Sequence, residues 1–97
     1  MDERDTDERL WNAAQAQAAA EAVRLHERAA EIHQEAAKLQ AEHTAEMTEK
    51  GEPEKAARAS EVAVEEGNLA ALERARADQA RARHQDMASR LDLPEQP

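Results

Sequence analysis

His26 and His33, in the N-terminal half, are the residues best suited to metal chemistry. They lie seven residues apart, which places them on one face of a helix, and Glu27 and Glu31 are close to them in sequence. Imidazole and carboxylate groups on facing helices can ligate zinc or iron. The Glu-x-x-His sequence of di-iron bundles is absent, because no glutamate has a histidine three residues later. A metal-carrying bundle using His26 and His33 is therefore kept as an alternative to structural edge histidines, and we assign no cofactor.

Catalytic chemistry has little support in the sequence. Paired carboxylates such as Glu65 and Glu66 act as general acids or bases only where a pocket shifts their pKa, and a helical hairpin offers no obvious pocket. The chain has no cysteine, no glycine-rich phosphate loop, no Gly-x-Ser-x-Gly sequence and no His-Glu-x-x-His sequence. We expect a protein that is not an enzyme.

Charge is the next chemical feature, since the net charge is −9 and the segment 42–66 is especially acidic. This balance argues against direct nucleic-acid binding, which needs clustered Lys and Arg. A small acidic protein can instead mimic the charge of nucleic acid and block a basic protein site. The acidic patch for that alternative is Glu46, Glu49, Glu52 and Glu54, and its simpler interpretation is a solvated surface.

The residues named above must be positioned by helices, because the composition of the chain strongly favours helix. Alanine accounts for 24 residues, Glu, Arg and Gln are abundant, and only two Gly and three Pro interrupt the chain. Asp5 as N-cap, with Glu8 three residues later, predicts a first helix over about 7–50. Gly51 and Pro53 predict a turn at 51–53, followed by a helix over about 54–91 and a frayed tail at 92–97. Gly67 leaves open a break that would make three helices.

Periodicity predicts how the two helices pair. Leu25, Ile32 and Leu39 recur every seven residues, with Ala22, Ala29 and Ala36 three residues before each of them. We expect this stripe to form the seam, in register with the alanine row Ala56, Ala63, Ala70 and Ala77, and residue numbers that face each other should sum to roughly 104. His43 and His84 fall on predicted seam positions. They are either buried neutral histidines or the titrating residues of a pH-dependent interface. The fold class is thus all-α, one domain over 1–97, a long antiparallel alanine-rich hairpin.

Few large apolar side chains are available to stabilise such a hairpin, which favours a protein–protein interaction module that self-associates or docks on a larger protein. Trp11, the only aromatic residue, either covers Leu91 and Leu93 or anchors a partner. There is no cysteine, no apolar run long enough to span a membrane and no apolar secretory segment, so we expect a cytoplasmic protein without membrane insertion. The predicted interface residues are Trp11, Leu25, Ile32, Leu39, Leu69, Leu72, Met87 and Leu91.

Overall fold

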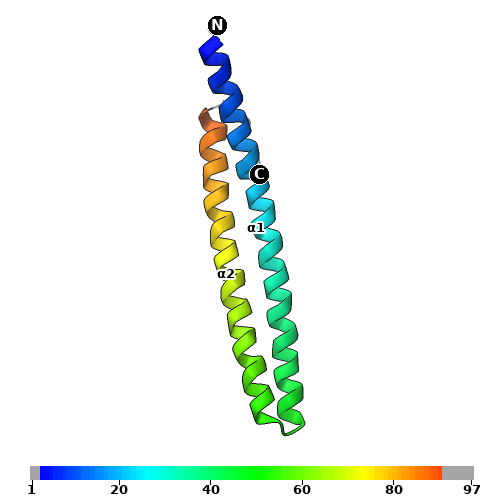
Figure 1. The fold of residues 1–97 in the computed structure, drawn as a ribbon. Coiled ribbons are helices and arrows are strands. Elements are labelled where there is room, and N and C mark those ends of the chain that lie inside the picture. Colours follow the sequence, from blue (N-terminus) through cyan, green and yellow to red (C-terminus); the bar gives the residue numbers. More distant parts are fainter. Residues whose placement is uncertain (1–2, 91–97) are drawn as a thin grey trace. The chain divides into compact units, whose positions relative to one another are not determined.

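The computed structural model describes residues 3–90 and confirms the all-α class. It consists of two long antiparallel helices packed against each other, α1 (Glu3–Glu49) and α2 (Pro53–Arg90), joined by a short turn (Figure 1). The predicted end of the second helix at Leu91, and the tail after it, lie outside the described residues. No helix within the described part of the chain is both long enough and apolar enough to cross a membrane.

The turn forms as the glycine and proline pattern predicts. Gly51 has a φ of 74°, a left-handed conformation that glycine adopts without a steric penalty. The Gly51 N–H donates to the Thr48 carbonyl at 3.1 Å, and the Glu52 N–H donates to the Met47 carbonyl at 2.9 Å. This pair of bonds is a Schellman motif, which satisfies carbonyl groups that the end of α1 would otherwise leave unpaired. Pro53 then begins α2, where its missing N–H has no cost.

One sequence-based helix boundary differs from the structure, and one alternative left open by the sequence is excluded. Helix α1 begins at Glu3, so Asp5 lies in its first turn and is not the N-cap; an acidic first turn still suits the positive end of the helix dipole. The three-helix alternative is wrong, because α2 continues through Gly67. A Cβ built at Gly67 would meet nothing within 4 Å, so packing does not require a glycine there. Residues of high helix propensity on both sides of Gly67 outweigh the cost of about 1 kcal/mol that a glycine imposes inside a helix.

The chain divides into two compact units, each with a segment of both helices. The turn unit comprises Glu27–Arg74, and the terminal unit comprises Met1–His26 with Ala75–Pro97. In the turn unit, the residues most withdrawn from solvent recur at alternating spacings of three and four along each helix, as two helices paired through heptads require. We call these positions the seam: 30, 33, 37, 40, 44 and 47 on α1, and 56, 59, 63, 66, 70 and 73 on α2.

Alanine fills four of the six seam positions on α2 and two of the six on α1. The alanine row predicted on α2 is confirmed, since Ala56, Ala70 and Ala77 are buried and Ala63 is half-buried. Ala30, Ala59 and Ala70 are 4% exposed or less, and Met47 is the only large apolar side chain buried within the described residues. Alanine allows two helix backbones to approach closely, but each residue buries little apolar surface. The Thr44 hydroxyl, also on the seam, donates to the Gln40 carbonyl at 2.9 Å, so its polar group is satisfied within its own helix.

The terminal unit is built in the same way. Ala16 and Ala19 of α1 are buried, as are Ala77 and Ala80 of α2, again at helical spacings of three. His84 is half-buried at the seven-residue spacing that continues from Ala77, where the sequence predicted a seam histidine. His43, the other predicted seam histidine, is exposed on α1.

The prediction for the α1 seam is wrong. Leu25, Ile32 and Leu39 are 68%, 60% and 56% exposed and therefore do not lie between the helices. The register also differs, since His33 pairs with Glu66, whose numbers sum to 99 rather than 104. Both the predicted and the observed α1 patterns alternate spacings of three and four, so periodicity alone does not distinguish them. In the turn unit, four residues of the predicted pattern each precede an observed seam residue by one position, a rotation of about 100° around the helix: Ala29, Ile32, Ala36 and Leu39.

Candidate protein-docking face

The large apolar side chains of the turn unit gather outside the seam. Six of them are exposed to a substantial degree, and one of the six, Val64, is described with the opposite side below. The other five are Ile32 and Leu39 on α1, and Val62, Leu69 and Leu72 on α2, with exposed fractions from 38% to 60%. Isolated apolar residues on a surface are ordinary, whereas a contiguous group marks an interaction site. The question is whether these five share one side of the helix pair.

Their offset from the seam places them together. Ile32 and Leu39 immediately precede the seam residues His33 and Gln40, and on α2 each of the three residues likewise immediately precedes a seam residue. Antiparallel helices that face each other are related by a two-fold axis perpendicular to the pair. Residues that precede a seam residue by one position therefore lie on the same side of the helix pair, whichever helix they belong to. With Ala29 and Ala36 between them, we call this surface the docking face: Ala29, Ile32, Ala36, Leu39, Val62, Leu69 and Leu72.

The opposite side of the turn unit has a different character. Its positions immediately follow each seam residue, and Val64 is the only large apolar side chain among them, 61% exposed. The remaining residues are small or polar: Glu31, Gln34, Lys38, Ala41, Ala45, Thr48, Ala57, Ser60, Gly67, Ala71 and Arg74. The large apolar side chains therefore lie mainly on one side, which is the pattern of a helix pair that packs against another element through one face. The same side also carries polar and charged residues at the same offset from the seam, most of them toward the turn: His43, Glu46, Lys55, Arg58 and Glu65.

A polar pair lies in the seam beside the docking face. The Nδ1 atom of His33 is 2.5 Å from the Oε2 atom of Glu66, and both side chains are about a quarter to a third exposed. Residue His33 directly follows Ile32 on α1. A polar pair at a heptad seam favours one register over neighbouring ones, because a shift separates donor from acceptor. We infer that this pair helps to hold the docking residues of α1 and α2 level with each other.

The histidines do not form a metal centre in the described part of the chain. Within residues 3–90, no three His, Cys, Asp or Glu side chains lie close enough together to hold an ion. His33 is engaged with Glu66, and His26 is half-buried and also has an interaction partner. This arrangement does not favour the metal-carrier alternative, and we do not propose it.

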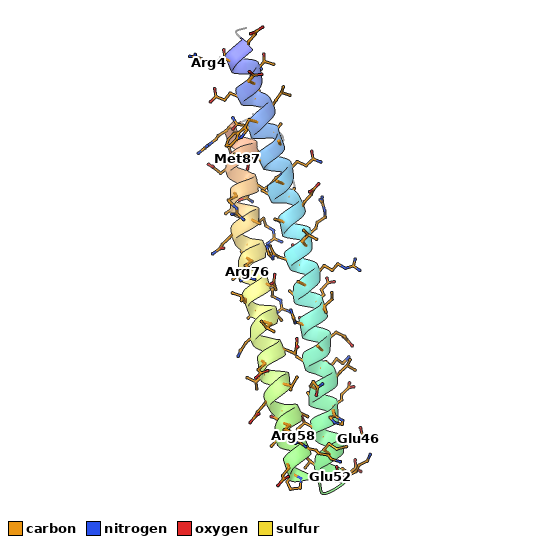
Figure 2. The ribbon with its side chains drawn as sticks, in the orientation of Figure 1. Arg4, Glu46, Glu52, Arg58, Arg76 and Met87 are labelled. Atoms are coloured by element: carbon orange, nitrogen blue, oxygen red, sulfur yellow. The ribbon has the colours of Figure 1, made fainter. Side chains whose placement is uncertain are left out.

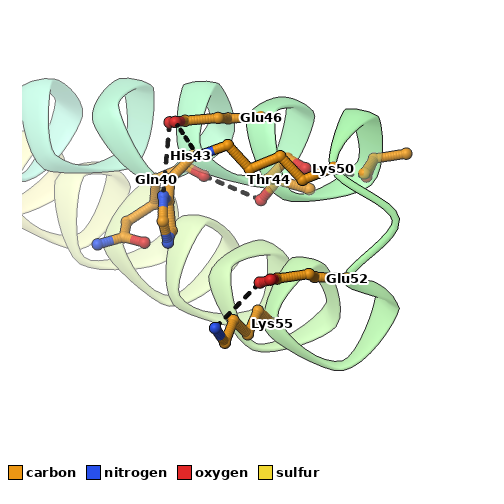
Figure 3. Close-up of polar contacts among 8 residues, drawn as sticks. Gln40, His43, Thr44, Glu46, Lys50, Glu52 and Lys55 are labelled. Carbon is orange, nitrogen blue, oxygen red and sulfur yellow. Dashed lines mark hydrogen bonds and ion pairs between the residues drawn. The ribbon is translucent and has the colours of Figure 1, made fainter.

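The acidic patch near the turn is partly neutralised by neighbouring lysines (Figure 3). The Lys50 Nζ donates to the Glu46 Oε1 at 2.9 Å, and the Lys55 Nζ lies 3.0 Å from the Glu52 Oε2. The hydrogen bond from Lys50, and secondarily its charge, lowers the pKa of Glu46 from its ordinary value of 4.5. Figure 2 shows Glu46, Glu52 and Arg58 near the turn end of the two helices. Since two of the four patch carboxylates have a cationic partner, the patch is a weak imitation of a phosphate row.

The other predicted interface residues are dispersed. Trp11 is 61% exposed, which is compatible with an anchor for a partner, whereas Leu91 and Leu93 lie outside the described residues. Met87, in the terminal unit, is half-buried and lies three residues after the half-buried His84. Leu25 is exposed and, seven residues before Ile32, occupies the same helix position along α1. The role of these residues toward a partner stays a prediction.

Val62 belongs to the docking face but was not among the predicted interface residues. Its signal was present in the sequence, because Val62 and Leu69 are seven residues apart and each precedes a member of the alanine row by one position. Assigning the alanine row to the seam leaves these two residues at its edge.

Comparison with known proteins gives no assignment: the chain matches no protein-family model, no curated protein and no solved structure.

Proposed function

We propose that this protein is a non-enzymatic helical-hairpin interaction module whose docking face binds another helical surface. The observation that carries the proposal is the inverted distribution of apolar side chains in the turn unit. Met47 is the only large apolar residue at the twelve seam positions, six of which are alanine, while Ile32, Leu39 and Leu69 are 41% to 60% exposed on one side. Covering those side chains is favourable by about 25 cal/mol for each Å² of apolar surface removed from water.

The arrangement suits a helix-in-groove contact. The apolar side chains of two neighbouring helices form two parallel rows, with the small residues Ala29 and Ala36 between larger ones along α1. A third helix that presents residues at spacings of three and four can insert its side chains between such rows. The mechanism is burial of apolar surface with the hairpin as a prebuilt platform, and it requires no catalytic group, metal or cofactor.

The proposal is tested by substituting the docking face and measuring association. A double variant, Ile32→Glu with Leu69→Glu, places two carboxylates where a partner would remove water, and each would be costly to bury unpaired. The purified chain is examined by sedimentation equilibrium, and the immobilised chain is incubated with an extract of its native host and analysed by mass spectrometry. We expect the association of the unmodified chain, with itself or with a host protein, to be lost in the double variant.

Val64→Glu is the matched control. Val64 is β-branched and as exposed as Ile32, but it lies on the opposite side of the seam. This variant should associate as the unmodified chain does, and circular dichroism should show the same helix content for all three proteins. Association that survives the double variant, or that Val64→Glu weakens equally, would contradict the proposal.

A further inference from the structure

We propose that the docking face binds a second copy of this chain, with the two turn units parallel, their turns at the same end, and a two-fold axis that runs along the helices. This inference rests on the proposed function and specifies its partner. In this arrangement α1 of each turn unit lies against α2 of the other. A docking-face position is about 100° around the helix from the seam residue that follows it, so each helix meets its second neighbour at roughly a right angle to the first, as four helices in a square bundle require.

The contact between His33 and Glu66 sets the heights of residues above the turn. Residues of α1 and α2 whose numbers sum to about 99 lie at the same height. The side of the turn unit that carries the docking face changes character with height. Its residues near the turn are polar or charged: His43, Glu46, Lys55 and Arg58. The apolar docking face lies farther from the turn, interrupted by Glu65, so an occupant must match charge at one end and apolar surface at the other.

Two kinds of two-fold axis can stack these faces on each other, and they differ in what they bring together. An axis along the helices keeps every residue at its own height, so the apolar parts of two copies meet and the polar parts meet. An axis across the helices reverses one copy. Placed at the middle of the turn unit, it opposes the apolar part of each copy to the polar part of the other. Placed at the middle of the apolar part, it leaves the polar parts without overlap. The parallel arrangement therefore covers the whole face with like on like.

The apolar residues of α2 match those of α1 height by height. Leu69 lies at the height between Ala29 and Ile32 of the second copy. Val62, one heptad nearer the turn, meets the next alanine and leucine of α1 in the same way. At both heights a large side chain of α2 faces a small and a large one of α1, and such alternation allows helices to interdigitate.

Charge takes the place of apolar bulk one further heptad toward the turn. Lys55 lies at the height between His43 and Glu46 of the second copy, so an ammonium group approaches a carboxylate. Each already has a partner on its own helix, Lys55 with Glu52 and Glu46 with Lys50. The dimer extends these two pairs into a network of four charges that alternate in sign, and the symmetry forms it twice. Networks of exposed charges stabilise more than isolated pairs do.

Two charged residues of the face have other surroundings in the dimer. Arg58 lies within one residue of the height of Glu42 of the second copy, an exposed carboxylate on the outer side of α1. Glu65 lies at the height between Ile32 and Ala36, so its carboxylate loses water against apolar side chains. That loss is unfavourable and makes Glu65 the residue at which the dimer can be strengthened.

The area available within the turn unit alone is what a dimer requires. The α1 segment from Glu27 to Glu49 contains 23 residues, which is about 35 Å at 1.5 Å per residue. Two helices side by side are about 20 Å wide. The resulting area of about 700 Å² is close to the roughly 800 Å² that each partner contributes to an ordinary stable interface. A single added helix would cover only part of this width, whereas a second hairpin covers all of it.

The first test is sedimentation equilibrium of the full chain at concentrations up to about 200 µM, where mass action favours dimers. We expect a monomer–dimer equilibrium that Leu69→Glu weakens by about 100-fold, because each copy then places a carboxylate between Ala29 and Ile32 of the other. Val64→Glu, on the opposite side, should change the dimer constant by no more than about threefold. A monomeric unmodified chain at the highest concentration, or a dimer insensitive to Leu69→Glu, overturns the inference.

The second test strengthens the dimer and so does not depend on a variant that could fail to fold. Glu65→Leu replaces a desolvated carboxylate by an apolar side chain and should tighten the dimer by about tenfold. Glu61→Leu, on the outer surface of α2, is the matched control and should change the dimer constant by no more than about threefold. A dimer that Glu65→Leu weakens or leaves unchanged, or that both variants tighten equally, overturns the inference.

The third test determines the orientation. The chain has no cysteine, so Ala36→Cys and Val62→Cys each carry a single thiol, and the parallel dimer brings these two positions of different copies to the same height. When the two variants are mixed and mildly oxidised, a disulfide-linked heterodimer, identified by its mass, should exceed both homodimers beyond the proportions of random collision. A mixture of Ala36→Cys with Val64→Cys should show no such excess. Random proportions in the first mixture, or an excess of the Ala36→Cys homodimer, overturn the parallel arrangement.

These experiments also separate the inference from the proposed function on which it rests. If the unmodified chain is monomeric yet captures a host protein only while Ile32 and Leu69 are intact, the second-copy inference fails and the proposed function stands. If the chain binds neither itself nor a host protein, both fail.

Discussion

The seam and the docking face of the turn unit are neighbouring strips of the same two helices with opposite contents. Every docking-face residue precedes a seam residue by one position, yet the seam consists of six alanines, five polar residues and Met47, while the face contains Ile32, Leu39 and Leu69. In an ordinary globular protein the larger apolar side chains would be the buried ones. The difference indicates that α1–α2 pairing is a close but thin contact, and that most of the apolar surface is available for something outside the hairpin.

The largest effect on folding should come from enlarging one seam alanine. Ala30 is 3% exposed, so Ala30→Leu adds atoms where two backbones approach closely and should destabilise the hairpin by about 1–3 kcal/mol. Ala29→Leu, one residue earlier on the docking face, should change the unfolding free energy by about 0.5 kcal/mol or less. Urea unfolding followed by circular dichroism measures both. Equal effects would show that the seam and the face do not differ in packing.

Removing the polar pair of the seam should have the next largest effect. Glu66→Ala takes away the acceptor of His33 and should cost about 1–2 kcal/mol, since a partly buried imidazole loses its hydrogen-bond partner. A double-mutant cycle with His33→Ala should give a coupling energy of about 0.5–3 kcal/mol. A coupling energy near zero would mean that the contact does not help to hold the register of the docking residues.

The two glycines should respond in opposite directions to alanine. Gly51→Ala forces a side chain into a left-handed conformation, with φ at 74°, and should destabilise the protein by about 1–2 kcal/mol. Gly67→Ala, which touches neither the seam nor the docking face, should stabilise α2 by about 1 kcal/mol through helix propensity alone. Thermal denaturation of the two variants, compared with the unmodified chain, distinguishes these signs. Destabilisation by Gly67→Ala would indicate packing at that position.

The smallest effect concerns the acidic patch. Lys50→Ala should return the pKa of Glu46 upward toward 4.5, because the hydrogen bond and charge that lower it are removed. Any stability from the pair is present above the ordinary carboxyl pKa and is lost as pH falls through the lowered value. Carbon-detected NMR titration of the Glu46 carboxyl measures the shift, with Lys38→Ala, outside the patch, as control. An unchanged Glu46 pKa in Lys50→Ala would show that the pair does not persist in solution.

Much of this molecule follows from local sequence chemistry. The alanine content and scarcity of glycine and proline determine two long helices, and Gly51 with Pro53 determines where the chain reverses direction. These features depend on backbone propensity and on steric limits within a few residues, so they can be predicted without tertiary information. The same local nature explains the error at Asp5, where helix α1 begins earlier than the predicted N-cap, and it explains why the break left open at Gly67 does not occur, since neighbouring helix formers continue α2 through it.

Only the tertiary structure decided which stripe of α1 faces α2. Two stripes on α1 have the same alternation of three and four residues, one containing Ala30, His33 and Ala37 and the other containing Leu25, Ile32 and Leu39. Periodicity is identical for both, so the choice depends on fit across the seam, where alanine meets alanine and His33 meets Glu66. That choice turns the larger side chains outward, and the docking face exists because the smaller stripe pairs within the hairpin.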